Sequence, residues 1–296
     1  MIHDLGFVAQ RLFNTPIAVH PRKGEIALAS LMARLGIDEM VRADGRPVPL
    51  AFDQEDEAFE ASGRSHDPGY DMVGGIAVIP IEGTLFQKRS SLRPYSGATG
   101  YNGIRQAFLT ALGDPGVDAI AFDIRSGGGE VAGCFDLVDT IFGARGEKPM
   151  AAILSEYAYS AAYAIASAVD PGRIYVPRTG GTGSIGVICM HADISEGLGK
   201  AGIKVTFITS EDADRKTDGR SELPLSDDAF AAIKAEIDAM GVIFCDTVAR
   251  NRGLTTDTVR GLKAGTFMGA AGVTAGLADA VMAPDAAFAA LLADLT

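Results

Sequence analysis

Short apolar runs rich in β-branched residues recur along most of the chain, separated by clusters of glycine and polar residues. Runs of this length, bounded by turn residues, are typical of buried β-strands. The pattern predicts strands at residues 74–85, 118–124, 148–154 and 202–209.

Helical patterns fall between these runs. The predicted helices cover residues 101–112, a segment from about Glu130, a segment from Ser160 and residues 227–252. Strand–turn–helix units therefore recur at residues 118–143 and 150–169. This order is typical of stacked parallel β/α units rather than of an antiparallel sandwich, so the predicted fold class is α/β.

The composition changes abruptly near residue 70. The segment before it carries two helical patterns, one ending at an NTP turn and one over residues 25–35, followed by a tract rich in acidic residues, Gly and Pro. That tract has too few apolar residues to pack by itself. We therefore predict a helical lead segment and acidic linker at 1–70, a core domain at 71–285 and a C-terminal helical tail at 286–296.

Charge and composition exclude several classes of function. The net charge of −12 and the pI near 4.8 argue against nucleic acid as a partner, because phosphate binding needs a basic surface. The N-terminus lacks a basic start followed by an apolar run, and no stretch approaches about 18 apolar residues. Neither a signal peptide nor a membrane span is expected. Cys134, Cys189 and Cys245 show no metal-binding spacing, which indicates reduced core thiols.

Residues 157–167, YAYSAAYAIAS, place Ser160 at the start of a helix made almost wholly of small apolar residues. Such a helix lets other backbone pack close to it, and the free N–H groups at a helix N-terminus favour a developing negative charge. A nucleophilic serine needs this electrostatic setting. Serine is also a favoured N-cap, so a capping serine on a buried helix is the alternative.

The glycine-rich turn at residues 126–133, SGGGEVAG, matches neither phosphate-loop pattern, because its glycines have the wrong spacing and no Lys-Ser or Lys-Thr follows. A glycine turn at the end of a parallel strand can instead present bare N–H groups to an oxyanion. The alternative is a tight strand-to-helix turn without a catalytic role.

A nucleophilic serine needs a base. Three histidines, His3, His20 and His66, lie in the lead segment, and only His191 lies in the core, where a lone histidine is more often structural. The chain has no GxSxG motif of the α/β-hydrolases. A lysine can also act as a base once it is deprotonated. The lysines after Ser160 are Lys200, Lys204, Lys216, Lys234 and Lys263, each by default a solvated surface charge.

Three motifs follow one another along the chain. Ser160 lies in AYSAAYAIASAVD, which is followed by GRIYVP and TGSIGV. The segment DIRSGGGEV precedes this region, and RKTDGRSELPL, with Lys216, Asp218 and Gly219, follows it. Over about residues 74–283 this combination resembles the signal peptide peptidase A family of serine proteases. It is most similar to the phage branch, the capsid-assembly (prohead) proteases similar to the lambda capsid protein C, as is the start RLFNTPIAVHPRKGE. Gly127 stands where the family has proline.

The resemblance implies the Clp protease/crotonase fold, with stacked ββα units and the active site at the strand ends. It implies a Ser–Lys dyad in which Ser160 attacks the peptide carbonyl and Lys216 is general base and then acid. The oxyanion donors would be the backbone N–H groups of Gly129 and Ala161. Glycine at position 127 loosens this turn, and no metal or cofactor is implied.

Two other functions remain open at this point. A crotonase-fold acyl-CoA enzyme shares glycine-rich oxyanion turns but needs Glu or Asp and a CoA site, and no strong adenine or phosphate site is visible. A non-catalytic assembly protein could keep the fold alone, although the presence of both Ser160 and Lys216 argues against it.

The resemblance also implies a homo-oligomer in which neighbouring subunits help to complete each active site. Two apolar surfaces fit this expectation, or else pack on their own core. The first is a stripe at Phe230, Ile233, Ile237, Met240, Ile243 and Phe244, and the second is the tail AAFAALLADL. Without an anchor, the expected substrates are soluble phage scaffold, portal or neighbouring head proteins, supplied as separate chains. The expected location is the cytoplasm of a bacterial host or an assembling capsid.

Overall fold

The computed structural model describes residues 16–19 and 67–295. The predicted helices of the lead segment, the acidic linker, His3, His20 and His66 lie outside the described residues. Residues 16–19 of that segment run beside the core, as detailed below. The division of the chain into three parts stays a prediction.

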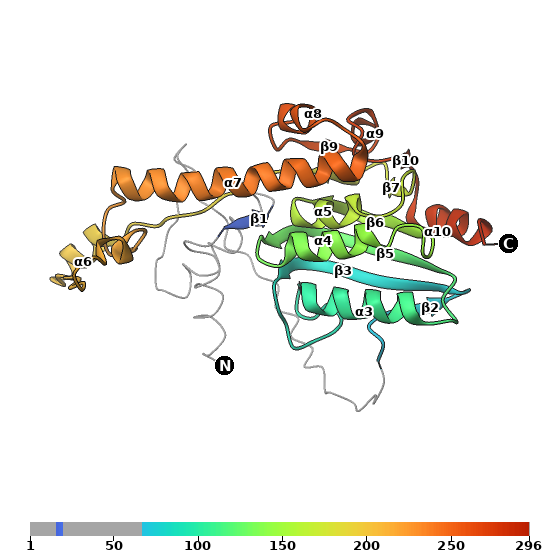
Figure 1. The fold of residues 1–296 in the computed structure, drawn as a ribbon, viewed down its shortest axis with the longest axis horizontal. Helices are drawn as coiled ribbons and strands as arrows, with labels where there is room; N and C mark the ends of the chain where they lie inside the picture. The colour runs from blue at the N-terminus through green and yellow to red at the C-terminus, as the bar shows by residue number, and fades with distance from the viewer. Residues whose placement is uncertain (1–15, 20–66, 296) are drawn as a thin grey trace.

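One mixed β-sheet organises the described residues (Figure 1). Its central strands are parallel, in the order β3, β5, β6, β7 and β10, and β2 is antiparallel to β3 at the edge. Their bounds are β2 Asp71–Val73, β3 Ile76–Phe86, β5 Ala119–Glu130, β6 Met150–Tyr159, β7 Ile174–Val176 and β10 Ala280–Val281.

The three longest strands change partners along their length. The register shifts between Gly83 and Thr84 on β3 and between Ile124 and Ser126 on β5, and such bulges bend a strand. Beyond these points the strands pair with short partners: β3 with β4, β5 with β1, and β6 with β8, which in turn pairs with β9. The partners are β1 Ile17–Val19, β4 Ala98–Gly100, β8 Gly181–Gly183 and β9 Thr266–Met268.

Helices cover both faces of the central sheet. On one face lie α3 (Tyr101–Gly113), α4 (Cys134–Gly143) and α5 (Ala161–Ser167), and on the other lies α10 (Pro284–Ala293). Successive strand residues point to opposite faces, so alternate residues of each strand enter one core or the other.

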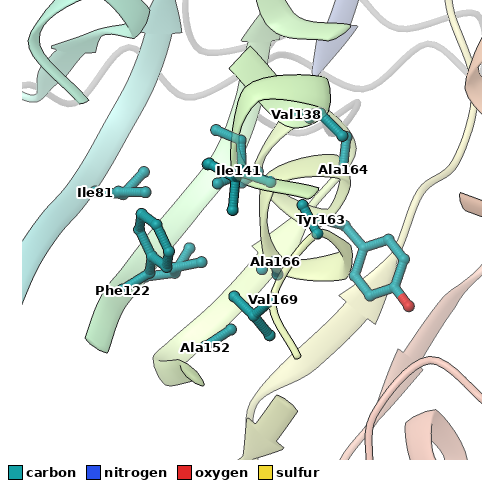
Figure 2. Close-up of a cluster of buried hydrophobic side chains, with 14 of the residues drawn as sticks. Ile81, Phe122, Val138, Ile141, Ala152, Tyr163, Ala164, Ala166 and Val169 are labelled. Atoms are coloured by element: carbon teal, nitrogen blue, oxygen red, sulfur yellow. The ribbon is translucent and has the colours of Figure 1, made fainter. Parts of the chain in front are cut away.

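The larger core lies under α3, α4 and α5. Figure 2 shows Ile81 and Phe122 from the strands near Val138 and Ile141 of α4, all of them buried. Tyr163 of α5 points away from this group, and its buried hydroxyl donates to the Leu277 carbonyl at 2.9 Å. The smaller core contains Ile76, Ala119, Ala121, Ala151, Ile153, Ala287 and Leu291. The C-terminal tail therefore packs at least partly on its own sheet.

The long helix α7 (Asp227–Arg252) joins the body to a protruding segment (Figure 1). One face of its second half is buried, with Phe244 and Val248 in the larger core, whereas Phe230 in the first half is 57% exposed. The segment before it contains α6 (Ser195–Lys200) and the 3-10 helix η1 (Asp214–Thr217). Residues 195–240, called the arm below, thus leave several apolar side chains exposed. Two short helices, α8 (Thr256–Gly261) and α9 (Ala270–Thr274), follow α7.

The α/β class and the repeated parallel strand–helix units are confirmed, and their order agrees with the Clp protease/crotonase-like fold implied by the resemblance. Cys134 and Cys245 are buried and Cys189 is partly exposed, all three as free thiols. None of the helices in the described ranges is long and apolar enough to cross a membrane.

Two details of the sequence interpretation are wrong. The predicted strand at residues 202–209 is not one, because its β-branched side chains extend into solvent in the arm, where Ile208 is 94% exposed. The glycine turn at residues 127–129 is part of β5, which continues to Glu130, so α4 begins only at Cys134.

Candidate active site

Ser160 lies at the junction between β6 and α5, where the chain turns sharply from strand to helix. Its φ of 55° and ψ of −123° are unusual for a residue other than glycine. Two backbone hydrogen bonds hold it there: its N–H donates to the Gly183 carbonyl at 2.8 Å, and its carbonyl accepts from the N–H of Ala164 at 3.0 Å. Strain of this kind concentrates at functional sites.

The hydroxyl of Ser160 is fully buried. Within residues 16–19 and 67–295 its Oγ has no hydrogen-bond partner, although leaving a buried polar group unsatisfied costs about 1–3 kcal/mol. Ser160 also does not cap α5 through its side chain. Ser160 is therefore not a side-chain cap of the helix, and its hydroxyl group is free to react.

The glycines at the end of β5 lie against Ser160. A Cβ added to Gly128 would stand 2.9 Å from Cβ of Ser160 and 3.0 Å from the N atom of Ala161, and it would collide with the Ala18 carbonyl oxygen. The φ of Gly128 is +96°, a conformation that other residues rarely adopt. Only glycine at this position lets the strand, the nucleophile and β1 approach so closely.

Ser126 stabilises this glycine-rich end of β5 through its side chain. Its Oγ donates to the Gly83 carbonyl at 2.6 Å and accepts from the N–H of Gly128 at 3.2 Å. The sequence interpretation named Gly129 as an oxyanion donor, but it assigned no individual role to Gly128, Ser126 or the segment that forms β1. A serine directly before three glycines was the available signal for Ser126, and an apolar IAV run after Pro16 was the signal for β1.

Ala161 is the first residue of α5, and its N–H is one of the groups that a helix leaves without an internal acceptor. The thiol of Cys134 lies close by, 3.8 Å from the Ala161 carbonyl oxygen. Burial raises the pKa of Cys134 to about 12. Because a thiol reacts as thiolate, the thiol of Cys134 stays protonated at neutral pH and is a poor nucleophile.

Lys216 lies in the arm and is exposed. Its neighbours Asp214 and Arg215 line a shallow cavity together with Asp228 and Ala232 of the first turns of α7. The 3-10 helix that carries Lys216 is therefore held at the beginning of α7, the end that projects from the body in Figure 1.

The other end of α7 packs beside α5, where the side-chain amide of Asn251 donates to Oγ of Ser167 at 2.9 Å. Asp228 and Asn251 are separated by about 35 Å of helix at 1.5 Å per residue. The seven residues of α5 recover only about 10 Å of this. Lys216 and Ser160 of one chain are thus on the order of 20 Å apart, and a single copy does not form the predicted dyad.

His191 lies between Ile188 and α6, in a segment without helix or strand, and is partly buried. Among the described residues, no group of three or more His, Cys, Asp or Glu side chains is placed to hold a metal ion.

Comparison with models of protein families shows the family to which the chain belongs. The model of peptidase family S49 matches residues 144–295, a range that includes both Ser160 and Lys216. The chain belongs to peptidase family S49.

Two curated relatives of this S49 chain come from phages. The chain is 34% identical over 281 residues to the capsid assembly protease C of Escherichia phage lambda, covering 94% of this chain and 63% of that protein. It is 35% identical over 285 residues to the head-tail preconnector protein GP5 of Enterobacteria phage P21, covering 94% of this chain and 55% of that protein. The S49 chain thus spans less than two thirds of either relative.

Among solved structures, a point mutant of ClpP1 from Listeria monocytogenes is similar to this S49 chain with a TM-score of 0.43 and 12% sequence identity. The match covers 69% of this chain and 90% of that chain.

Proposed function

We propose that this chain is a serine endopeptidase that uses Ser160 as its nucleophile and Lys216 as its base. The observation that carries the proposal is the state of Ser160: a buried, strained serine whose hydroxyl has no partner among the described residues, placed beside a glycine-rich strand end. Membership of a peptidase family supports the same reaction class.

The proposed reaction uses groups on three elements. Oγ of Ser160 attacks the carbonyl carbon of a substrate peptide bond while Lys216 takes its proton and passes it to the leaving amine. The N–H groups of Gly129 and Ala161 stabilise the negative charge on the carbonyl oxygen. Both donors belong to rigid elements beside Ser160, so they need no rearrangement during the reaction.

Lys216 reaches Ser160 only from another copy of the chain in this proposal. The separation within one chain is too large for proton transfer, which needs hydrogen-bond reach. The arm that carries Lys216 also exposes apolar side chains, among them Phe230 and Ile203 at 57% and 53% exposure. Contact with a neighbouring copy would bury this surface and bring Lys216 to the neighbour's Ser160, as a homo-oligomer allows.

The proposed substrates are phage head-assembly proteins such as scaffold, portal or neighbouring head proteins. This part rests on the names of the two relatives, one a capsid assembly protease and the other a head-tail preconnector. The proposed place of action is the host cytoplasm, during or within capsid assembly.

A fluorophosphonate probe tests the reaction class directly, because it reacts with an activated serine hydroxyl. The expected result is one labelled peptide containing Ser160, absent from the Ser160→Ala variant. A crotonase-like enzyme or a non-catalytic assembly protein would stay unlabelled. Labelling at a different serine in a protein that cleaves peptides would show that the nucleophile is misassigned.

Gly128→Ala tests the close approach of the glycines to Ser160. The new Cβ would lie 2.9 Å from Cβ of Ser160 and strain a φ of +96°, and a displacement of about 1 Å in a catalytic site can lower the rate roughly a hundredfold. We expect peptidase kcat to fall by about that factor. Gly172→Ala is the matched control, because Gly172 has a φ of +83° and a Cβ added to it would meet nothing within 4 Å. Equal activity of the two variants would contradict the assigned role of Gly128.

A further inference from the structure

β1 lies in the candidate site as an extended strand between two other segments. On one side it pairs antiparallel with the end of β5, and the N–H of Val131 donates to the Pro16 carbonyl at 3.4 Å. On the other side Ile17 and Ile188 exchange two hydrogen bonds of 2.9 and 3.0 Å between their backbone groups. Peptides are often recognised in this way, by adding a strand whose main chain supplies the hydrogen bonds.

The register of β1 brings one particular carbonyl to the nucleophile. Ala18 lies opposite Gly129. Opposed residues in an antiparallel ladder alternate between hydrogen-bonded and non-bonded pairs, and Pro16–Val131 is hydrogen-bonded. The pair two positions along is therefore hydrogen-bonded too, and the N–H of Gly129 faces the Ala18 carbonyl oxygen.

The Ala18 carbonyl oxygen, Ser160 and Ala161 all border one point beside Gly128. The space that a Cβ on Gly128 would fill is bordered by the Ala18 oxygen, by Cβ of Ser160 and by the N atom of Ala161. The Ala18 carbonyl therefore lies in the same small region as Ser160 and the N atom of Ala161, and its oxygen faces the N–H of Gly129 across the ladder.

The side chain of Ala18 suits a narrow position. It is only 1% exposed and belongs to the larger core, and Ile17 beside it is 4% exposed. A methyl group fits such an enclosed position, whereas a long or charged side chain would be buried without a partner.

We propose that Ser160 cleaves the Ala18–Val19 peptide bond of its own chain. This rests on the proposed function and names one substrate of the same site. Oγ of Ser160 attacks the Ala18 carbonyl carbon and loses its proton to the base. The C–N bond to Val19 then breaks, and the Val19 nitrogen takes the proton as a new amino terminus. Water hydrolyses the Ala18 ester, which releases a carboxylate and restores Ser160.

Intact-mass and N-terminal sequencing of the purified full chain test this cleavage. The wild-type chain should lose the residues before Val19 and begin at Val19, whereas Ser160→Ala should keep its full mass. Mixing the two should leave the Ser160→Ala chain uncut, because its strand is seated in its own site. If the wild-type chain cuts its Ser160→Ala partner at Ala18–Val19, the cleavage occurs between copies and the proposed self-cleavage is wrong.

A substitution in β1 tests which bond is cut. Ala18→Arg should leave residues 1–18 attached, because a charged side chain does not fit the enclosed position. Ala286→Arg is the matched control, since Ala286 is exposed on α10 at the opposite end of the sheet from β1 (Figure 1). It should be processed like the wild type.

The two proposals fail in different ways. A wild-type chain that hydrolyses casein through Ser160 yet keeps Ala18–Val19 intact would refute self-cleavage and leave the peptidase proposal standing. A wild-type chain that cuts neither casein nor itself would refute both.

Discussion

Ser160→Ala should lower peptide-bond cleavage at least about a thousandfold, because the hydroxyl alone carries the attack and losing a nucleophile removes most of the catalysis. The fold should survive, since alanine removes only the hydroxyl and Ser160 does not cap α5 through its side chain. The Oγ that is removed has no partner among the described residues, so the free energy of unfolding should stay equal or rise. Steady-state kinetics and urea unfolding of the purified variant measure both effects.

Ser167→Ala is the matched control for this result. Ser167 is also a buried serine of α5, but its Oγ donates to the Ala164 carbonyl at 2.7 Å and accepts from Asn251 at 2.9 Å. Its removal should lower the free energy of unfolding by about 1–3 kcal/mol because the Asn251 amide loses its partner, and leave kcat close to that of the wild type. Activity of Ser160→Ala above about a thousandth of the wild type would place the nucleophile elsewhere.

Local signals made the long helix the most predictable element. The sequence pattern predicts a helix over residues 227–252, and α7 has these bounds. Ser226 caps its start by accepting from the N–H of Ala229 at 3.2 Å, Asp227 and Asp228 fill its first turn, and Gly253 ends it with a φ of 66°. Each signal lies within a few residues of the boundary it sets, so the sequence alone suffices.

Strand pairing depends on distant residues and was predicted less well. The run at residues 202–209 has the composition of a strand, but it lies in the arm without forming one. The opposite error occurred at β5, where three glycines suggested a turn although β1 and β3 supply partners on both sides of Gly129. Propensity could not reveal either outcome, because the partners lie far away in the sequence.

The residues of the candidate site were also predictable to different degrees. The structure brings Ser160 and Ala161, which follow the end of β6, beside Gly128 near the end of the neighbouring parallel strand β5. It does not bring Lys216 to them. The order of residues along one chain contains no direct information about contacts between copies, so a site that a neighbouring copy completes could not be predicted from it.

Mixing two inactive variants should restore activity, and this is the sharpest test of that arrangement. Lys216→Ala and Lys216→Arg should each be about as inactive as Ser160→Ala, since arginine cannot lose its proton at working pH. Lys200→Ala, another exposed lysine of the arm, should keep wild-type activity. When Ser160→Ala and Lys216→Ala chains are dissociated, mixed equally and reassembled, some sites combine an intact Ser160 with a neighbour's intact Lys216.

The expected recovery is roughly a quarter of wild-type activity, because random assembly makes one in about four neighbouring pairs complete. Each variant alone, treated in the same way, should stay inactive. A mixture without recovery, although light scattering shows mixed oligomers, would contradict a dyad formed between copies. A fully active monomer in light scattering would contradict it as well, and would require the arm to move by on the order of 20 Å to bring Lys216 to Ser160 of the same chain.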